Sequence, residues 1–86
     1  MPPLVISKGA RKFIDTLAPK QAAQISKKIL DLCFDALPVD SIDLKGQTNG
    51  YRRTDIGEFR IVYRIAEGVV YVHDVGKRND GEVYRR

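Results

Sequence analysis

The hydrophobic positions of the chain follow a helical period in the first half and a strand period in the second. Between residues 7 and 36, two apolar stripes have the spacing of amphipathic helices. The first stripe consists of Ala10, Phe13, Ile14 and Leu17, and the second of Ala22, Ile25, Ile29, Leu32 and Ala36. Ser7 is a suitable N-cap for the first helix, and Pro19 suits the first turn of the second. So short a break between two helices predicts an antiparallel helical hairpin.

Strand-like alternation begins after residue 50. Segment 59–65 has apolar residues at its odd positions and Arg60, Val62 and Arg64 at its even positions, which predicts a strand. A second β-rich run covers residues 69–75, a third strand is expected at 51–55, and an N-terminal strand at 4–6. The predicted order is β-α-α-β-β-β. We therefore expect an α+β fold with the helical hairpin on one face of a small antiparallel sheet, as a single domain over residues 1–86.

The alternation also predicts which side chains share a face. If the odd residues of 59–65 lie under the helices, Arg60 and Arg64 lie on the other, open face. A three-residue turn centred on Glu67 would add Val70, Val72 and Asp74 to that face, with Asp74 opposite Arg60. Continued parity brings Arg78 to the same side, and Arg52 is a further candidate. The same register predicts a buried His73 beside Ile61 and a Tyr63–Tyr71 pair on the core side.

Composition removes several classes of protein. No apolar run approaches the about 20 residues of a membrane helix, and the N-terminus lacks the regions of a signal peptide. One cysteine and one histidine allow neither an internal disulfide nor a zinc cluster. We therefore expect a cytoplasmic protein without a membrane partner, metal or cofactor. Cys33 is expected to pack against the other helix as an unreactive thiol.

The distribution of charge says more than the net charge of +4. Residues 1–43 hold six basic and five acidic residues, whereas residues 44–86 hold nine and six. Seven of the eight arginines follow residue 50: Arg52, Arg53, Arg60, Arg64, Arg78, Arg85 and Arg86. Arginine suits fixed, bidentate recognition of phosphate, so an open arginine-rich face predicts phosphate binding. A solvated face with ion pairs such as Arg60–Asp74 is the alternative, and composition does not separate the two.

The helical hairpin is followed by five short segments whose order and spacing are informative. These segments are Leu44-Lys45-Gly46, Tyr51-Arg52-Arg53, Gly57-Glu58-Phe59-Arg60-Ile61-Val62-Tyr63-Arg64-Ile65, Val75-Gly76-Lys77-Arg78 and Glu82-Val83-Tyr84. Together with the hairpin, they make the chain resemble the RelE family of toxins, within the RelE/ParE superfamily. The resemblance implies an mRNA interferase, an endoribonuclease that cuts messenger RNA in the ribosomal A site. It also implies a RelB-like antitoxin whose acidic segment wraps the toxin.

The resemblance also implies site residues. The family's active-site arginine falls on Arg60, the arginine of its GKR motif on Arg78, and its C-terminal tyrosine on Tyr84. Its basic pair falls on Arg52 and Thr54 with Arg53 between them, and a shift of one residue stays open because turn lengths differ among relatives. The catalytic candidates are therefore Arg52, Arg60, Arg78 and Tyr84. The RNA-binding candidates are Lys45, Arg53, Arg64 and Lys77.

These residue types fit metal-independent cleavage of RNA by its own 2′-hydroxyl. An arginine cluster stabilises the negative charge of the phosphorane. We assign this role to Arg60, and assign to Arg78 either the same role or protonation of the leaving group. Tyr84 suits a proton-transfer role or stacking on a base. An arginine is a poor general base, so the ribosome is expected to orient the messenger RNA.

Two other functions are compatible with the same fold. The first is a ParE-like toxin that inhibits DNA gyrase by binding and has no nuclease activity. The second is a catalytically weak relative that binds RNA or antitoxin. The combination of Arg60, Arg78 and Tyr84, which ParE-like chains tend to lack, favours the nuclease.

Overall fold

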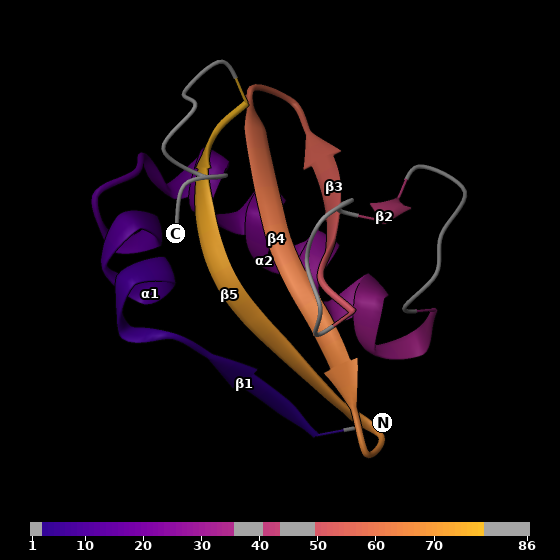
Figure 1. Ribbon diagram of the computed structural model, residues 1–86. Helices are drawn as coiled ribbons and strands as arrows, with labels where there is room; N and C mark the ends of the chain where they lie inside the picture. Colours follow the sequence, from indigo (N-terminus) through magenta and orange to yellow (C-terminus); the bar gives the residue numbers. More distant parts are fainter. Residues whose placement is uncertain (1–2, 36–40, 44–49, 79–86) are drawn as a thin grey trace.

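The computed structural model describes residues 3–35, 41–43 and 50–78. Its elements are β1 (Leu4–Ile6), α1 (Lys8–Asp15), α2 (Pro19–Phe34), β2 (Ile42–Asp43), β3 (Arg52–Ile56), β4 (Phe59–Ala66) and β5 (Val69–Lys77). The strands form one sheet in the order β1-β5-β4-β3-β2. Figure 1 shows α2 crossing one face of this sheet, with α1 beside β5. The predicted α+β fold, with two helices between the first strand and the later ones, is confirmed.

The sheet differs from the prediction at both edges. β1 pairs parallel with β5, in the register Leu4 to Val70, so the sheet is mixed rather than antiparallel. In the β3-β4-β5 meander, one edge of β5 has no neighbouring strand, and β1 pairs with that edge. β1 runs parallel to β5, and the chain passes from its end directly into α1. β2 is a two-residue strand on the edge of β3, where the sequence pattern predicted no strand. A pair of residues is too short to show alternation.

The core lies between the helices and one face of the sheet. Ser7 caps α1 by accepting a hydrogen bond from the Ala10 backbone N–H, and Pro19 begins α2, both as predicted. The fully or nearly fully buried residues of the core are Ala10, Ile25, Ile29, Leu32, Phe59, Ile61, Tyr63, Val70, Val72 and Val75. Phe13 packs edge-on against Phe59 with ring centroids 6.0 Å apart. The odd residues of β4 therefore face the helices, as the alternation predicts.

A two-residue turn sets the register between β4 and β5. Glu67 and Gly68 both have positive φ, 52° and 76°, and Ala66 pairs with Val69 across them. This conformation favours a tight hairpin because its twist matches that of the strands. The predicted three-residue turn is therefore wrong. Its consequence is wrong as well, since Val70 and Val72 face the helices rather than sharing the face of Arg60.

The same turn moves the odd residues of β5 to the other side of the sheet. His73 is exposed instead of buried beside Ile61. The predicted Tyr63–Tyr71 pair is also absent, because Tyr71 lies opposite Arg64.

A β-bulge then changes the parity of β5. Val72 pairs with Tyr63 and Asp74 pairs with Val62, so His73 is the extra residue. Beyond the bulge, Asp74 shares the face of Arg60 as predicted, but it lies opposite Val62 and not opposite Arg60. The bulge therefore offsets, for Asp74, the error in the predicted turn.

Candidate functional site

The side of the sheet opposite the helices, here called the outer face, carries a carboxylate held by arginine. Asp55 on β3 pairs directly with Arg60 on β4. Arg60 donates from Nε to Asp55 Oδ1 at 2.7 Å and from Nη2 to Oδ2 at 3.1 Å, a bidentate geometry. Arg53, two residues before Asp55 on the same face, places Nη1 3.8 Å from Oδ2. The Arg60 side chain is only 13% exposed, so this geometry is fixed by its surroundings.

Arg78 approaches the same carboxylate from the end of β5. Its backbone N–H donates to the Glu58 carbonyl at 2.8 Å, which fixes it beside the β3–β4 turn. Its Nη1 donates to the Gly57 carbonyl at 3.4 Å. The hydrogen bond from Arg60 and the charges of Arg60, Arg53 and Arg78 hold the pKa of Asp55 below its ordinary value, against the opposing effect of partial burial.

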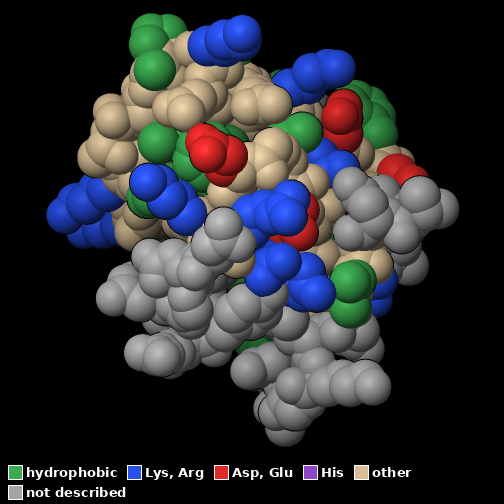
Figure 2. All heavy atoms as spheres, turned by 90° about the horizontal axis from the view of Figure 1, so that it is seen from above, with side chains coloured by type: hydrophobic (Ala, Val, Ile, Leu, Met, Phe, Trp, Pro, Cys, Tyr) green, Lys and Arg blue, Asp and Glu red, His purple; other side chains and the backbone are tan. Residues whose placement is uncertain are grey.

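We call Arg53, Asp55, Arg60 and Arg78 the arginine cluster. The charges of all three guanidinium groups act on the Asp55 carboxylate, and the buried Asp74 carboxyl lies on the same face of the sheet. Figure 2, viewed onto the end of the sheet with the β3–β4 turn, shows Lys and Arg side chains grouped around an acidic one. Such a cluster can bind a phosphodiester and stabilise negative charge that develops on it. An arginine does not readily exchange its proton, so proton transfer needs another group.

Arg52 lies on the opposite face from the cluster. It pairs with Tyr63, whose side chain is in the core, and donates from Nη2 to Ser41 Oγ at 2.9 Å and to the Ser41 carbonyl at 3.3 Å. The expectation that Arg52 lines the open face is therefore wrong. Neighbouring residues in a strand point to opposite sides, and Arg53 is the one beside Arg60.

The remaining predicted site residues are distributed more widely. Arg64 lies on the outer face, with its guanidinium carbon 4.6 Å from the centroid of the Tyr71 ring. Lys77 pairs with Phe59 at the end of β5 and is exposed, and it lines a shallow pocket with Gly57, Glu58 and Arg78. Lys45 and Tyr84 lie outside the described residues. The structure thus brings together Arg53, Arg60 and Arg78.

Sequence reasoning missed Asp55, Tyr51 and His73. Asp55 was detectable in principle, because a two-residue turn at Gly57-Glu58 pairs it with Arg60. His73 was missed because the predicted β4–β5 turn is one residue too long, and the Tyr51 ring lies 5.1 Å from the His73 ring. Cys33 is buried as predicted, and burial raises the pKa of its thiol, which keeps it in the unreactive protonated form.

Neither a metal site nor a membrane span is present in the part of the chain that the structure describes. Within those ranges, no three His, Cys, Asp or Glu side chains lie close enough to form a metal site. No helix there is long and apolar enough to cross a bilayer.

The comparisons with known proteins agree on one superfamily. Residues 4–81 match the family model described as "ParE toxin of type II toxin-antitoxin system, parDE". The isolated E. coli RelE toxin is 24% identical, with a TM-score of 0.77 over 99% of this chain and 93% of that one. A chain of the archaeal RelE–RelB complex from Pyrococcus horikoshii OT3 is 19% identical, with a TM-score of 0.79 over 90% and 94%.

A third similar structure belongs to the YoeB–YefM complex from Staphylococcus aureus. It is 19% identical, with a TM-score of 0.73 over 91% of this chain and 98% of that one. No curated protein sequence matches. These likenesses support the fold, and the family-model match over residues 4–81 supports the family.

Proposed function

Because the chain belongs to the RelE/ParE superfamily of toxins of type II toxin–antitoxin systems, we propose that it is a ribosome-dependent mRNA endoribonuclease. The observation that carries this proposal is the arginine cluster, in which Arg53, Arg60 and Arg78 surround a single carboxylate. Guanidinium groups gathered around one position suit the stabilisation of a pentavalent phosphorane, because arginine supplies positive charge without a metal.

In the proposed reaction, the 2′-hydroxyl of the messenger RNA attacks the adjacent phosphorus. Arg60 stabilises the negative charge that develops on the phosphorane oxygens, since its guanidinium is largely buried and firmly held. Arg78 contacts the same phosphate and adds to the stabilisation of its negative charge. Arg53 takes the position beside Arg60 that the sequence resemblance gave to Arg52. The bond from phosphorus to the 5′-oxygen then breaks. A 2′,3′-cyclic phosphate remains on one fragment, and the 5′-oxygen of the other takes up a proton in place of the one that the 2′-hydroxyl lost.

Proton transfer is the step for which the cluster is poorly equipped. Arginine holds its proton too tightly to act as an efficient base, and the pKa of Asp55 is depressed by its ion pairs. Tyr84, outside the described residues, is our candidate for the acid or base, and ribosome-imposed geometry of the messenger supplies the rest. The site of action would accordingly be the cytoplasm.

We also propose that a cognate antitoxin neutralises the toxin with an acidic segment. Several similar structures are toxin–antitoxin complexes, among them RelBE2 from Mycobacterium tuberculosis and the intact RelBE complex of E. coli. A carboxylate of such a segment would compete with the substrate phosphate for the arginine cluster, because both are anions with bidentate oxygen pairs.

The test uses Arg60→Ala and Arg78→Ala, with Arg11→Ala as the matched control. Arg11 is an exposed arginine on α1, away from the outer face. We expect each site variant to lower cleavage of ribosome-bound messenger RNA by about 100-fold or more, the usual effect of removing a preorganised charge donor. The control should cut like the unmodified protein. Equal cleavage by all three variants would contradict the proposal.

The family-model match makes ParE-like inhibition of DNA gyrase the second candidate. Supercoiling by purified gyrase in the presence of the toxin separates the two. Inhibition of supercoiling, with translated messengers intact, would establish the ParE-like function in place of the nuclease.

A further inference from the structure

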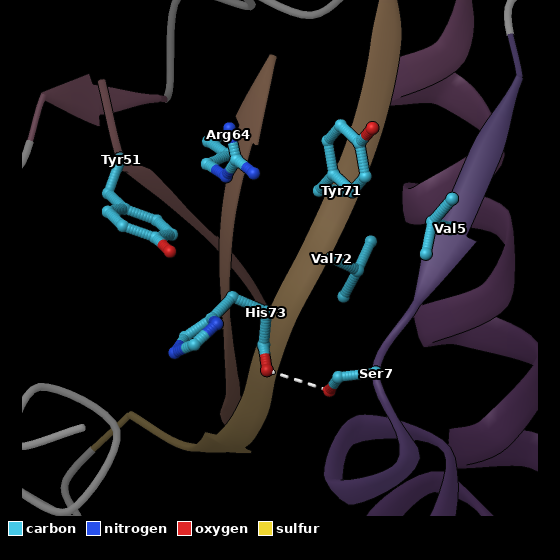
Figure 3. A pocket seen from close by; sticks show the side chains of 7 residues that line it. All are labelled: Val5, Ser7, Tyr51, Arg64, Tyr71, Val72 and His73. Carbon is cyan, nitrogen blue, oxygen red and sulfur yellow. Dashed lines mark hydrogen bonds between the residues drawn. The ribbon is translucent and has the colours of Figure 1, made fainter. Parts of the chain in front are cut away.

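A pocket of about 150 Å³ lies on the outer face, farther along β4 and β5 than the arginine cluster. Tyr51, Arg64, Tyr71 and His73 form much of its lining, with Val5 at the β1 side (Figure 3). The proposed cleavage chemistry uses none of these four polar or aromatic side chains. They come from β4, β5 and the residue before β3, so the pocket exists only in the assembled sheet.

The β-bulge shapes this pocket by leaving His73 as an extra residue on the outer face. Counted back from Val75, whose side chain is in the core, regular alternation would turn position 73 toward the helices. Ser7 secures the bulged backbone: its hydroxyl donates to the His73 carbonyl at 2.8 Å, and its N–H donates to the Val72 carbonyl at 3.0 Å. Figure 3 shows the hydrogen bond to His73 at the edge of the pocket.

The lining consists of flat groups with a positive charge among them. The Tyr51 and His73 rings are 5.1 Å apart and tilted by 56°. The Arg64 guanidinium lies over the Tyr71 ring at 4.6 Å, in a cation–π arrangement. Aromatic rings and guanidinium planes are the surfaces on which proteins stack unpaired nucleobases. Tyr71 is half-buried and forms a fixed part of the pocket wall, whereas His73 is exposed and accessible to a ligand.

The pocket lies close enough to the arginine cluster for one strand of RNA to reach both. Tyr51 precedes Arg53 by two residues, about 7 Å along the strand direction, and Arg64 follows Arg60 by four, about 13 Å. A strand of RNA with its scissile phosphate in the arginine cluster would therefore have the base of a nucleotide one or two positions away at the pocket.

We propose that this pocket receives one unstacked nucleobase of the single-stranded RNA whose phosphate occupies the arginine cluster. The inference rests on the proposed nuclease function and adds a substrate-positioning subsite to it. Tyr51, Arg64, Tyr71 and His73 are positioning residues, since they contact the base and not the reacting phosphate.

The experiment measures binding of fluorescently labelled oligoribonucleotides by anisotropy. Each oligonucleotide is compared with a series in which one base at a time is replaced by an abasic ribose. The proteins are the unmodified chain, His73→Ala, His73→Phe, Tyr71→Ala and Arg60→Ala. His73→Phe keeps a ring for stacking, and circular dichroism checks that every variant is folded.

We expect one abasic position to weaken binding to the unmodified chain by at least about fivefold, the loss of one stacked base. His73→Ala should weaken binding to intact RNA by a similar factor, and removal of the base at that position should then cause no further loss of affinity. His73→Phe should restore both the affinity and its dependence on that base. Tyr71→Ala should behave like His73→Ala.

Three results would overturn the inference. If Arg60→Ala weakens binding but His73→Ala and base removal do not, the subsite is wrong and the nuclease proposal stands. If RNA binding is insensitive to Arg60→Ala and to His73→Ala alike, both proposals fail. If His73→Ala weakens binding of the cognate antitoxin and leaves RNA binding unchanged, the pocket belongs to the antitoxin.

Discussion

At the scale of single residues, Asp55 is the group that organises the site. Its carboxylate holds the Arg60 guanidinium by two hydrogen bonds and lies within the fields of Arg53 and Arg78. It thereby keeps three like charges together in the absence of substrate, where they would otherwise repel one another. In the proposed function, an RNA phosphate entering the cluster would meet donors that are already aligned, which reduces the reorganisation that binding requires.

The lowered pKa of Asp55 predicts a pH-dependent contribution to stability. A carboxyl with a depressed folded-state pKa stabilises the fold above its unfolded-state pKa, and the stabilisation is lost as pH falls through the folded-state value. We expect Asp55→Asn to lower the free energy of unfolding by about 1 kcal/mol at pH 7. The difference should shrink below the ordinary carboxyl pKa of 3.8.

Urea unfolding of the unmodified chain and Asp55→Asn at pH 7 and pH 3 measures this difference. Asp31→Asn, which changes an exposed aspartate on α2, is the control. A difference for Asp55→Asn that is as large at pH 3 as at pH 7 would show that the ion pairs are not its source.

The sequence predicted correctly which arginines belong to the cluster when a motif marked them. It failed where a shift of one position along a strand determines which face of the sheet a side chain lies on. Arg60 and Arg78 were found from the motifs around them, and they do lie together. Arg52 and Arg53 are adjacent in sequence, but a shift of one residue in a strand moves a side chain to the other face. His73 was placed wrongly for the same reason, because the turn before β5 is one residue shorter than predicted.

At the scale of elements, Ser7 joins a helix to a strand. Its Oγ accepts from the Ala10 backbone N–H at the start of α1 and donates to the His73 carbonyl in β5. We expect Ser7→Ala to destabilise the protein by about 1–2 kcal/mol, because both a helix cap and a partner of the bulged backbone are lost.

Ser7→Thr keeps the hydroxyl and is the matched variant, expected to lie within about 0.5 kcal/mol of the unmodified chain. Denaturant unfolding followed by circular dichroism measures both. Equal free energies of unfolding for Ser7→Ala and the unmodified chain would contradict this prediction and show that water can take over the hydrogen bonds of the hydroxyl.

The elements themselves were mostly predictable. Helical spacing persists over sixteen residues in α2 and two-residue alternation over eight in β4, so each signal is repeated several times. The β4–β5 turn was misjudged because Glu67 is not a typical residue for positive φ, and only the neighbouring Gly68 gives a clear sign. The bulge in β5 leaves no mark in hydrophobic periodicity. The parallel direction of β1 depends on contacts between distant segments, which local patterns do not encode.

At the scale of the whole molecule, charge is segregated by element. The exposed lysines of α2 lie across the sheet from Arg53, Arg60 and Arg64, so the net charge of +4 underestimates the local positive charge of the outer face. Composition indicated this separation correctly, and the fold converts it into a cluster at one end of the sheet.

The three arginines of the cluster predict the salt dependence of RNA binding. With about three phosphate charges neutralised, the logarithm of the binding constant should fall with the logarithm of salt concentration with a slope of about −2. Arg60→Ala should reduce the slope by about 0.7. Titrations of single-stranded RNA at several salt concentrations measure it, with Lys20→Ala on α2 as control. A slope unaffected by Arg60→Ala would mean that phosphate binds elsewhere.

The parallel pairing of β1 with β5 has a consequence for how the protein folds during its synthesis. Leu4 has to wait for Val70, so the first strand to be synthesised is among the last to find its place. Pairing between segments so far apart in the sequence slows folding, because the intervening chain loses conformational entropy before the contact between the strands stabilises it. Arg78 follows β5, so the cluster is also incomplete until that strand has been made. A ribosome translating this message therefore carries a chain in which the proposed site is still incomplete.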